Sequence, residues 1–188
     1  VNIASDNTGT QYTGNKLNSV RNRYFRIRKK LQKKNTKSAK RLLKKRKRKE
    51  QRFANNTNHI ISKQLVDKAK ALGLGIALED LKGIRDRVTV KKAQRRTHVN
   101  WNFYDLRTKI TYKAILAGVK VVFVDPRNTS RMCSICGFIS KKNRPNQSTF
   151  LCQQCGFSCH ADLNASVNIG TRASVNTPNV VCVETKAA

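Results

Sequence analysis

The sequence contains Cys133-Ser-Ile-Cys136-Gly137 and, a short segment later, Cys152-Gln-Gln-Cys155-Gly156. Two such motifs at this separation are typical of a zinc ribbon. Structural zinc is held tetrahedrally by four protein ligands, and the glycine after each pair permits the backbone conformation that completes the turn. We therefore predict that Cys133, Cys136, Cys152 and Cys155 bind one structural Zn²⁺. The alternative is a pair of disulfides or four unrelated thiols.

The composition indicates a polyanionic partner. The chain has 188 residues, which suits one domain plus a small module, and its 40 Lys and Arg against 10 Asp and Glu give a net charge of +30. Nucleic acid is the usual partner of so basic a protein. An anionic membrane surface is the other candidate, but the sequence has no apolar run of transmembrane length. Four of the six cysteines in metal-binding spacing favour a reducing cytosol over secretion.

The basic residues concentrate in segment 16–52. Apolar residues recur there every three to four positions, which predicts a helix with a thin apolar stripe, broken in two near 35–38. A dense run of one charge sign can be a solvated face, but here we predict contacts with phosphates, which give affinity and salt dependence without sequence specificity. The predicted contact residues are Arg41, Lys44, Lys45, Arg46, Lys47, Arg48 and Lys49.

The rest of the chain alternates between predicted strands and helices. Periodicity and turn signals predict a strand and hairpin at 1–12, a helix at 58–72, a buried strand at 75–81, a helix at 101–116, a strand at 120–125, a helix after the ribbon, and a weakly structured tail from residue 171.

Two carboxylates occupy positions that suit a metal site. Glu79 lies at the C-terminal end of a predicted buried strand, where ligands commonly bind. Asp162 lies in the first turn of the last predicted helix, where the helix dipole favours a negative charge. The alternatives are a solvated strand end for Glu79 and a simple helix cap for Asp162.

The order of these elements resembles the RNase H-like fold of RuvC-type nucleases. More closely, the chain resembles the TnpB family, also called OrfB, which comprises transposon-associated RNA-guided DNA endonucleases related to type V CRISPR effectors. The resemblance covers nearly the whole chain. It is carried by segments 58–63, 75–83, 112–114, 121–126, 129–137 and 160–165.

The resemblance implies an α/β fold: an RNase H-like, RuvC-type mixed sheet with flanking helices and an inserted four-cysteine zinc ribbon. It also implies that Glu79 and Asp162 are catalytic and bind Mg²⁺, with DNA and a guide RNA as partners in a prokaryotic cytosol or nucleoid. The family's first catalytic aspartate precedes the segment that matches Val1, and Asp6 is a poor substitute for it. The 188-residue chain is therefore expected to cleave poorly or not at all by itself.

The expected organisation follows from these matches. Residues 1–127 form the RuvC-like core without its first strand, 128–157 the ribbon, 158–172 the last helix of the core, and 173–188 a tail. The preferred function is the C-terminal part of an RNA-guided DNA endonuclease of transposon origin. The alternatives are an RNA-guided DNA-binding protein without nuclease activity, and a zinc-ribbon protein that binds nucleic acid without a guide.

Overall fold

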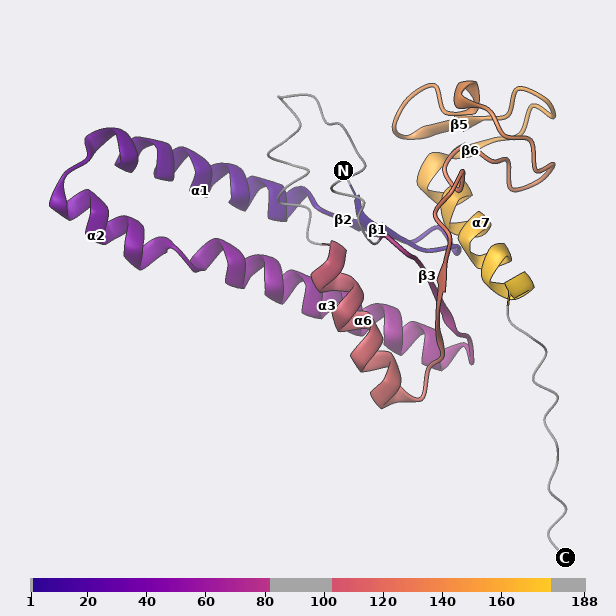
Figure 1. The fold of residues 1–188 in the computed structure, drawn as a ribbon, viewed down its shortest axis with the longest axis horizontal. Coiled ribbons are helices and arrows are strands. Elements are labelled where there is room, and N and C mark those ends of the chain that lie inside the picture. The colour runs from indigo at the N-terminus through magenta and orange to yellow at the C-terminus, as the bar shows by residue number, and fades with distance from the viewer. Residues whose placement is uncertain (1, 82–102, 177–188) are drawn as a thin grey trace, which may run out of the picture. The chain divides into compact units, whose positions relative to one another are not determined.

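The computed structural model describes residues 2–81 and 103–176, which divide between two compact units (Figure 1). The first unit comprises the described parts of Val1–Ile76 and Leu81–Val121, and the second those of Ala77–Asp80 and Val122–Ala188. Predictions for Trp101, for segment 82–100 and for the tail after residue 176 lie outside the described residues.

The first unit begins with a hairpin and continues into three helices. Strands β1 (Asn2–Ser5) and β2 (Gln11–Thr13) pair antiparallel, as the turn signals predicted. Helices α1 (Asn15–Lys34), α2 (Lys37–Arg46) and α3 (Lys49–Ala71) follow. Within this unit α2 and the start of α3 run back along α1 (Figure 1). We call α1 and α2 together the basic hairpin.

The break between α1 and α2 lies where the sequence predicted it. Asn35 adopts a left-handed conformation with φ of 49° and ends α1, a conformation that asparagine tolerates better than most residues. The side chain of Thr36 then caps α2 by accepting a hydrogen bond of 3.2 Å from the backbone N–H of Ala39. The start of α3 was predicted too late, because the helix already begins at Lys49 and continues without a break through residue 58.

Helix α6 (Phe103–Ala117) packs against α3. The apolar contribution of α6 centres on Ile110 and Ala114, which are 2% and 0% exposed. Beside them the amide of Asn58, buried in α3, donates a 2.7 Å hydrogen bond to the Asp105 carboxylate, which is also paired with Lys109. The carboxylate thus neutralises a lysine that would otherwise be a costly buried charge.

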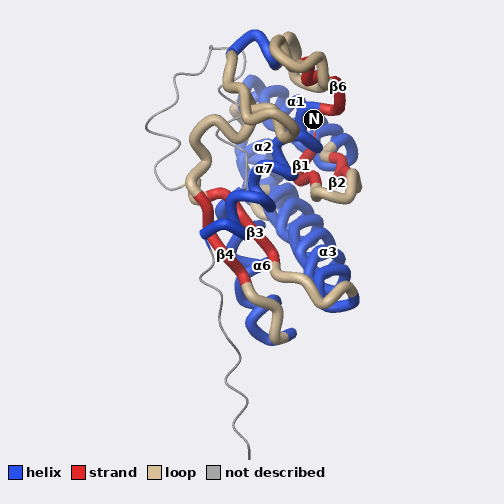
Figure 2. Tube along the Cα trace, turned by 90° about the vertical axis from the view of Figure 1, so that its right-hand side faces the viewer, coloured by secondary structure: helices blue, strands red, loops and turns tan. Residues whose placement is uncertain are grey.

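Strands β3 (Ile76–Glu79) and β4 (Val121–Val124) lie side by side (Figure 2). The N–H of Ile76 donates to the carbonyl of Lys120 and the N–H of Asp80 to that of Val124, each at 2.8 Å. From the first of these bonds to the second, the residue on each strand advances in the same chain direction by the same number of positions. The two strands are therefore parallel. The described residues contain three separate two-stranded sheets. The α/β class is therefore confirmed, and the single RNase H-like mixed sheet stays a prediction.

The second unit ends in a ribbon and a helix. A short 3-10 helix (Lys141–Asn143) precedes the antiparallel pair β5 (Thr149–Leu151) and β6 (Ser158–His160), and β6 runs directly into α7 (Ala161–Asn176). Helix α7 is longer than predicted, because it continues beyond residue 171. The guanidinium of Arg172 donates to backbone carbonyls of Asp125 and Arg127, which anchors this part of the helix.

Candidate metal centre and carboxylate site

The four predicted zinc ligands come together. The Sγ atoms of Cys133 and Cys155 lie 3.7 Å apart and those of Cys136 and Cys152 lie 3.6 Å apart, and all four lie within 4.8 Å of one another. A disulfide would place two sulfurs about 2.05 Å apart, whereas a regular ZnS₄ tetrahedron with Zn–S of about 2.3 Å has edges of about 3.8 Å. The four thiols could therefore hold a metal such as zinc.

Each cysteine motif folds into a turn, and the two turns have the same conformation. Gly137 and Gly156 have φ of 75° and 72°, a conformation that glycine adopts without steric cost. Their N–H groups donate to the carbonyls of Cys133 and Cys152 at 3.0 and 3.1 Å. The backbone N–H of Cys155 also points at the sulfur of Cys152 and lowers the pKa of that thiol to about 6. The pKa of Cys136 moves the other way: a backbone hydrogen bond from Phe138 lowers it, but burial and hydrogen bonds with the other three sulfurs outweigh this and raise it to about 12.

A buried asparagine joins the two halves of the ribbon. Asn143 is 0% exposed. Its amide donates to the carbonyls of Arg131 and Phe138 at 2.9 and 3.1 Å, and its oxygen accepts from the N–H of Gln153 at 3.1 Å. These three bonds tie the first cysteine turn to the second. Nearby, Phe150 is completely buried against Cys133, Cys152 and Ala161, so the ribbon has a small core beside its metal ligands.

Glu79 lies at the end of β3 as predicted, and its carboxylate is held in place. The hydroxyl of Thr129 donates a 2.6 Å hydrogen bond to Oε1 of Glu79. Thr129 is only 3% exposed. Sequence reasoning missed this partner because Thr129 follows in the chain only after an intervening helix and a second strand. Its only signal was a place in the segment that leads into the ribbon.

Asp162 lies in the first turn of α7, also as predicted. The guanidinium of Arg144 approaches its Oδ1 at 3.4 Å and also donates to the carbonyl of Gln147 at 2.9 Å. About a third of the Asp162 side chain is exposed. Arg144 belongs to the loop that follows the 3-10 helix, and nothing in its sequence neighbourhood indicated this pairing.

Both carboxylates belong to the second unit, with partners that differ in charge: a neutral hydroxyl for Glu79 and a cation for Asp162. Among the described residues, the four cysteines are the one group of three or more side chains placed to share a metal. The assignment of Glu79 and Asp162 to a Mg²⁺ site stays a prediction.

Asp6 has a structural role in the β1–β2 turn. Its carboxylate accepts hydrogen bonds from the N–H groups of Thr8 and Thr10 at 3.1 and 2.9 Å, and from the Lys68 ammonium of α3 at 2.7 Å. Burial by itself would raise the pKa of Asp6, but these hydrogen bonds outweigh it and lower the pKa. Through its contact with Lys68, the Asp6 carboxylate joins the β1–β2 turn to α3.

The predicted phosphate-contact residues lie around the turn between α2 and α3. Six of the seven are exposed and Arg46 is partly buried. No acidic residue occurs between Asp6 and Glu50 in the sequence. Glu50 forms a 2.8 Å ion pair with Arg28 of α1. Within the described part of the chain, no helix has the length and apolar character needed to cross a membrane.

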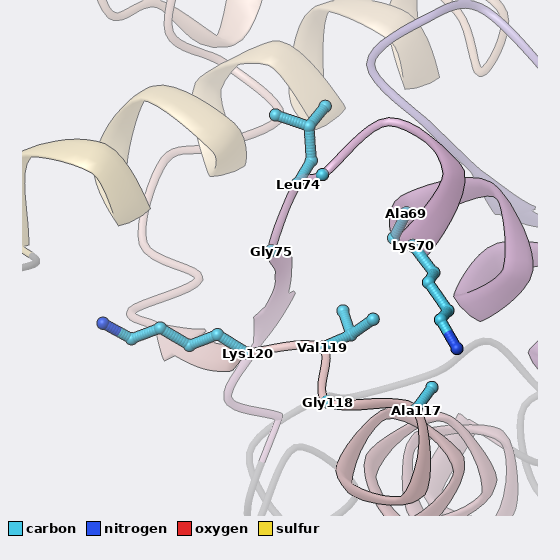
Figure 3. A pocket seen from close by; sticks show the side chains of 9 residues that line it. Ala69, Lys70, Leu74, Gly75, Ala117, Gly118, Val119 and Lys120 are labelled. Carbon is cyan, nitrogen blue, oxygen red and sulfur yellow. The ribbon is translucent and has the colours of Figure 1, made fainter.

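A cavity of about 270 Å³ lies in the first unit, where α3 and α6 end (Figure 3). Small residues and backbone form most of its wall, with Lys70 and Lys120 at its margin. Figure 3 shows that the side chain of Lys120 points away from that of Lys70. None of the residues predicted to bind metal or phosphate lines this cavity.

The known proteins to which this chain is similar include Cas12f and TnpB-like proteins. Residues 103–169 match the family model of the Cas12f1-like TNB domain. The chain is 46% identical over 118 residues to the CRISPR-associated endodeoxyribonuclease Cas12f1 of Sulfoacidibacillus thermotolerans, a match that covers 62% of this chain and 26% of that protein. It is 34% identical over 158 residues to a TnpB-like protein of Methanocaldococcus jannaschii, which covers 82% of this chain and 56% of the relative.

A solved structure gives the same result. The cryo-EM structure of a Cas12f1–sgRNA–target DNA complex superposes with a TM-score of 0.67 at 25% identity, over 85% of this chain and 43% of that one. The chain thus spans about a quarter to just over half of the length of these relatives. The resemblance that the sequence motifs predicted is confirmed: the chain is a relative of the TnpB-like and Cas12f proteins.

Proposed function

We propose that this chain is the C-terminal part of an RNA-guided DNA endonuclease, in which Glu79 and Asp162 bind Mg²⁺ at a RuvC-like site. One observation carries the proposal. The segment that matches the Cas12f1-like TNB domain includes both the four-cysteine cluster and Asp162, and Glu79 belongs to the same compact unit. The names of the relatives, which include endodeoxyribonucleases, support the same activity.

The two carboxylates fit the chemistry of phosphodiester hydrolysis. Hard oxygen ligands suit Mg²⁺, which when bound stabilises the charge on the attacking and leaving oxygens. Glu79 is held by Thr129 at 2.6 Å, and a fixed carboxylate loses less conformational freedom when it binds a metal. Asp162 lies in the first turn of α7, beside the loop that carries Arg144. The proposal also requires an RNase H-like sheet that brings the Glu79 and Asp162 side chains together.

The basic hairpin supplies the nucleic-acid contact. Exposed Lys and Arg side chains at the α2–α3 turn bind backbone phosphates without reading sequence. Sequence specificity comes instead from base pairing between guide RNA and target DNA, while the protein holds the heteroduplex through its backbone.

The test uses the full translation product of the gene that encodes this chain. Small RNA that copurifies with the protein is sequenced, and a DNA duplex complementary to it is incubated with the complex in Mg²⁺ or in EDTA. We expect Mg²⁺-dependent cleavage that Glu79→Gln or Asp162→Asn abolishes without changing zinc content or RNA binding. Asp67→Asn, which changes an exposed carboxylate of the first unit, is the matched control and leaves cleavage intact.

A second candidate is an RNA-guided DNA-binding protein without nuclease activity. The ion pair between Arg144 and Asp162 favours it, because a paired carboxylate is less available to a metal. In the same assay this protein binds the complementary duplex equally well with and without Mg²⁺ and never cuts it. Absence of copurified RNA would contradict both candidates and favour a zinc-ribbon protein that binds nucleic acid without a guide.

A further inference from the structure

Segment 129–134 links the candidate carboxylate site to the four-cysteine cluster. At one end Thr129 bonds to Glu79, and four residues later Cys133 belongs to the four-cysteine cluster that could hold a metal. Both Thr129 and Cys133 are buried, at 3% and 1% exposed. A small displacement of the ribbon therefore acts on the Glu79 contact through only a few residues of backbone.

Two buried asparagines of α7 hold this segment in place. Asn168, 2% exposed, donates to the carbonyls of Thr129 and Met132 at 2.9 and 2.8 Å. Asn164, 1% exposed, donates to the carbonyl of Met132 at 2.8 Å and accepts from the N–H of Ser134 at 3.0 Å. Since unpaired buried amides and carbonyls are costly, the segment and α7 keep one relative arrangement.

The Thr129 hydroxyl has one hydrogen, and two acceptors lie near it. Oε1 of Glu79 is at 2.6 Å and the carbonyl of Pro126 at 3.1 Å. The shorter contact is to the carboxylate, and a hydroxyl-to-carboxylate bond of this length belongs to the strong, charge-assisted class. The hydroxyl therefore fixes which way the Glu79 carboxylate faces.

We infer that Thr129 is a positioning residue for Glu79, and that Asn164 and Asn168 make this positioning depend on the folded, zinc-loaded ribbon. The inference rests on the proposed function, in which Glu79 binds a divalent metal. It assigns the ribbon a task beyond its own stability: the state of the four-cysteine cluster sets the metal affinity of a carboxylate in the same unit.

The experiment observes Glu79 directly in the zinc-loaded 188-residue chain. The sequence has three glutamates, at positions 50, 79 and 184, so selective ¹³Cδ labelling gives three carboxyl signals, and Glu79→Gln identifies the one from Glu79. Mn²⁺ is the probe, because it is a hard, paramagnetic cation that prefers carboxylate oxygens to thiolates. The readout is the Mn²⁺ concentration that halves each signal, with Glu50 as the internal control.

The variants separate positioning from stability. Thr129→Val keeps the side-chain shape but removes the hydroxyl, and Thr129→Ser keeps the hydroxyl. Loss of an outer-shell partner typically weakens metal affinity ten- to a hundredfold. We therefore expect Thr129→Val to shift the Glu79 ¹³Cδ signal and to need roughly tenfold more Mn²⁺, Thr129→Ser to restore both, and zinc removal from the wild-type chain to reproduce the Val result.

Each contrary outcome has its own meaning. A wild-type Glu79 signal that does not respond to Mn²⁺ would overturn the inference alone, because the proposed function is tested separately by cleavage with the full translation product. A wild-type response that Thr129→Val leaves unchanged would overturn the positioning role alone. A wild-type response that survives zinc removal would overturn the dependence on the ribbon.

Discussion

The ribbon and the basic hairpin are held together in opposite ways. In the ribbon, a few side chains point inward: two buried cysteines, Phe150 and Asn143 make its centre, and the four sulfurs converge on one point. In the basic hairpin, Leu17 of α1 and Ala39 of α2 are the buried residues of those two helices. About half of the other side chains of these helices are Lys or Arg, and nearly all of those face solvent.

The ribbon and the basic hairpin are therefore stabilised by different kinds of interaction. The ribbon depends on a small number of specific groups, so the loss of any one of them is costly. The hairpin depends on helical geometry, on packing against α3 and on one ion pair between Arg28 and Glu50. We therefore expect that replacing its exposed charged side chains changes the binding of a partner more than it changes folding.

The largest expected effect is loss of the metal. Zinc binding and folding are coupled in small metal domains, with apparent binding energies of about 10–16 kcal/mol. Chelation or Cys136→Ser should therefore unfold the ribbon while the helices of the first unit persist, as followed by amide NMR. Cys159→Ser is the matched control, because Cys159 lies outside the four-cysteine group, and it should keep one zinc per chain. A folded ribbon in protein that contains no zinc would contradict this prediction.

The next effect breaks the link between the two cysteine turns. Asn143→Ala removes all three hydrogen bonds that join the two cysteine turns through this side chain, so we expect the ribbon to lose about 2–4 kcal/mol of stability. Urea unfolding at saturating zinc measures this loss. Asn146→Ala is the comparison, since Asn146 is exposed, and its cost should stay below about 1 kcal/mol. Equal costs at the two positions would show that the inward-facing amide is not special.

A smaller effect is expected in the β1–β2 turn, which contains Asp6. Asp6→Asn weakens the contact with Lys68, and we expect a loss of about 1–2 kcal/mol at pH 7. Because the folded-state pKa of Asp6 is lowered, the carboxylate stabilises the fold fully above its usual value of 3.8 and this stabilisation is lost as the pH falls through the lower folded value.

The difference in unfolding free energy between wild type and Asp6→Asn should therefore shrink below about pH 4. Asp67→Asn, an exposed change beside Lys68 in the sequence, is the control and should show no comparable acid dependence. A difference that stays constant from pH 7 to pH 3 would contradict the ion-pair interpretation.

The smallest effect on stability is expected at the end of α2 and in the turn that follows it. Replacing Lys44, Lys45 and Lys47 together with Gln should change the unfolding free energy by no more than about 0.5 kcal/mol per residue. The same change should lower the salt dependence of duplex binding, by about 0.9 in the slope of log K against log salt for each phosphate that the protein no longer neutralises. Fluorescence anisotropy over a range of salt concentrations measures it. An unchanged slope would place the phosphate-binding side chains elsewhere.

Local sequence predicted the features that depend on neighbouring residues. The spacing within each cysteine motif, with its trailing glycine, was enough to predict a four-sulfur cluster, because the turn itself brings two sulfurs together. The apolar period predicted the helices, and the polar stretch at 35–38 predicted a break that the structure has between Lys34 and Lys37. Helix ends were less certain, since α3 starts earlier and α7 ends later than the pattern suggested.

The tertiary structure alone decided which residues hold the candidate carboxylates. Thr129 reaches Glu79 across 50 positions and Arg144 reaches Asp162 across 18, and no periodicity or spacing rule relates residues so far apart. The same holds for Asn164 and Asn168, which look like ordinary polar helix residues in the sequence yet are buried against segment 129–134. The sequence alone thus determined that four cysteines could share a metal, and it predicted which carboxylates bind Mg²⁺ and which basic residues bind phosphate. Only the packing of distant segments, driven by the need to satisfy buried polar groups, decided how those groups are oriented.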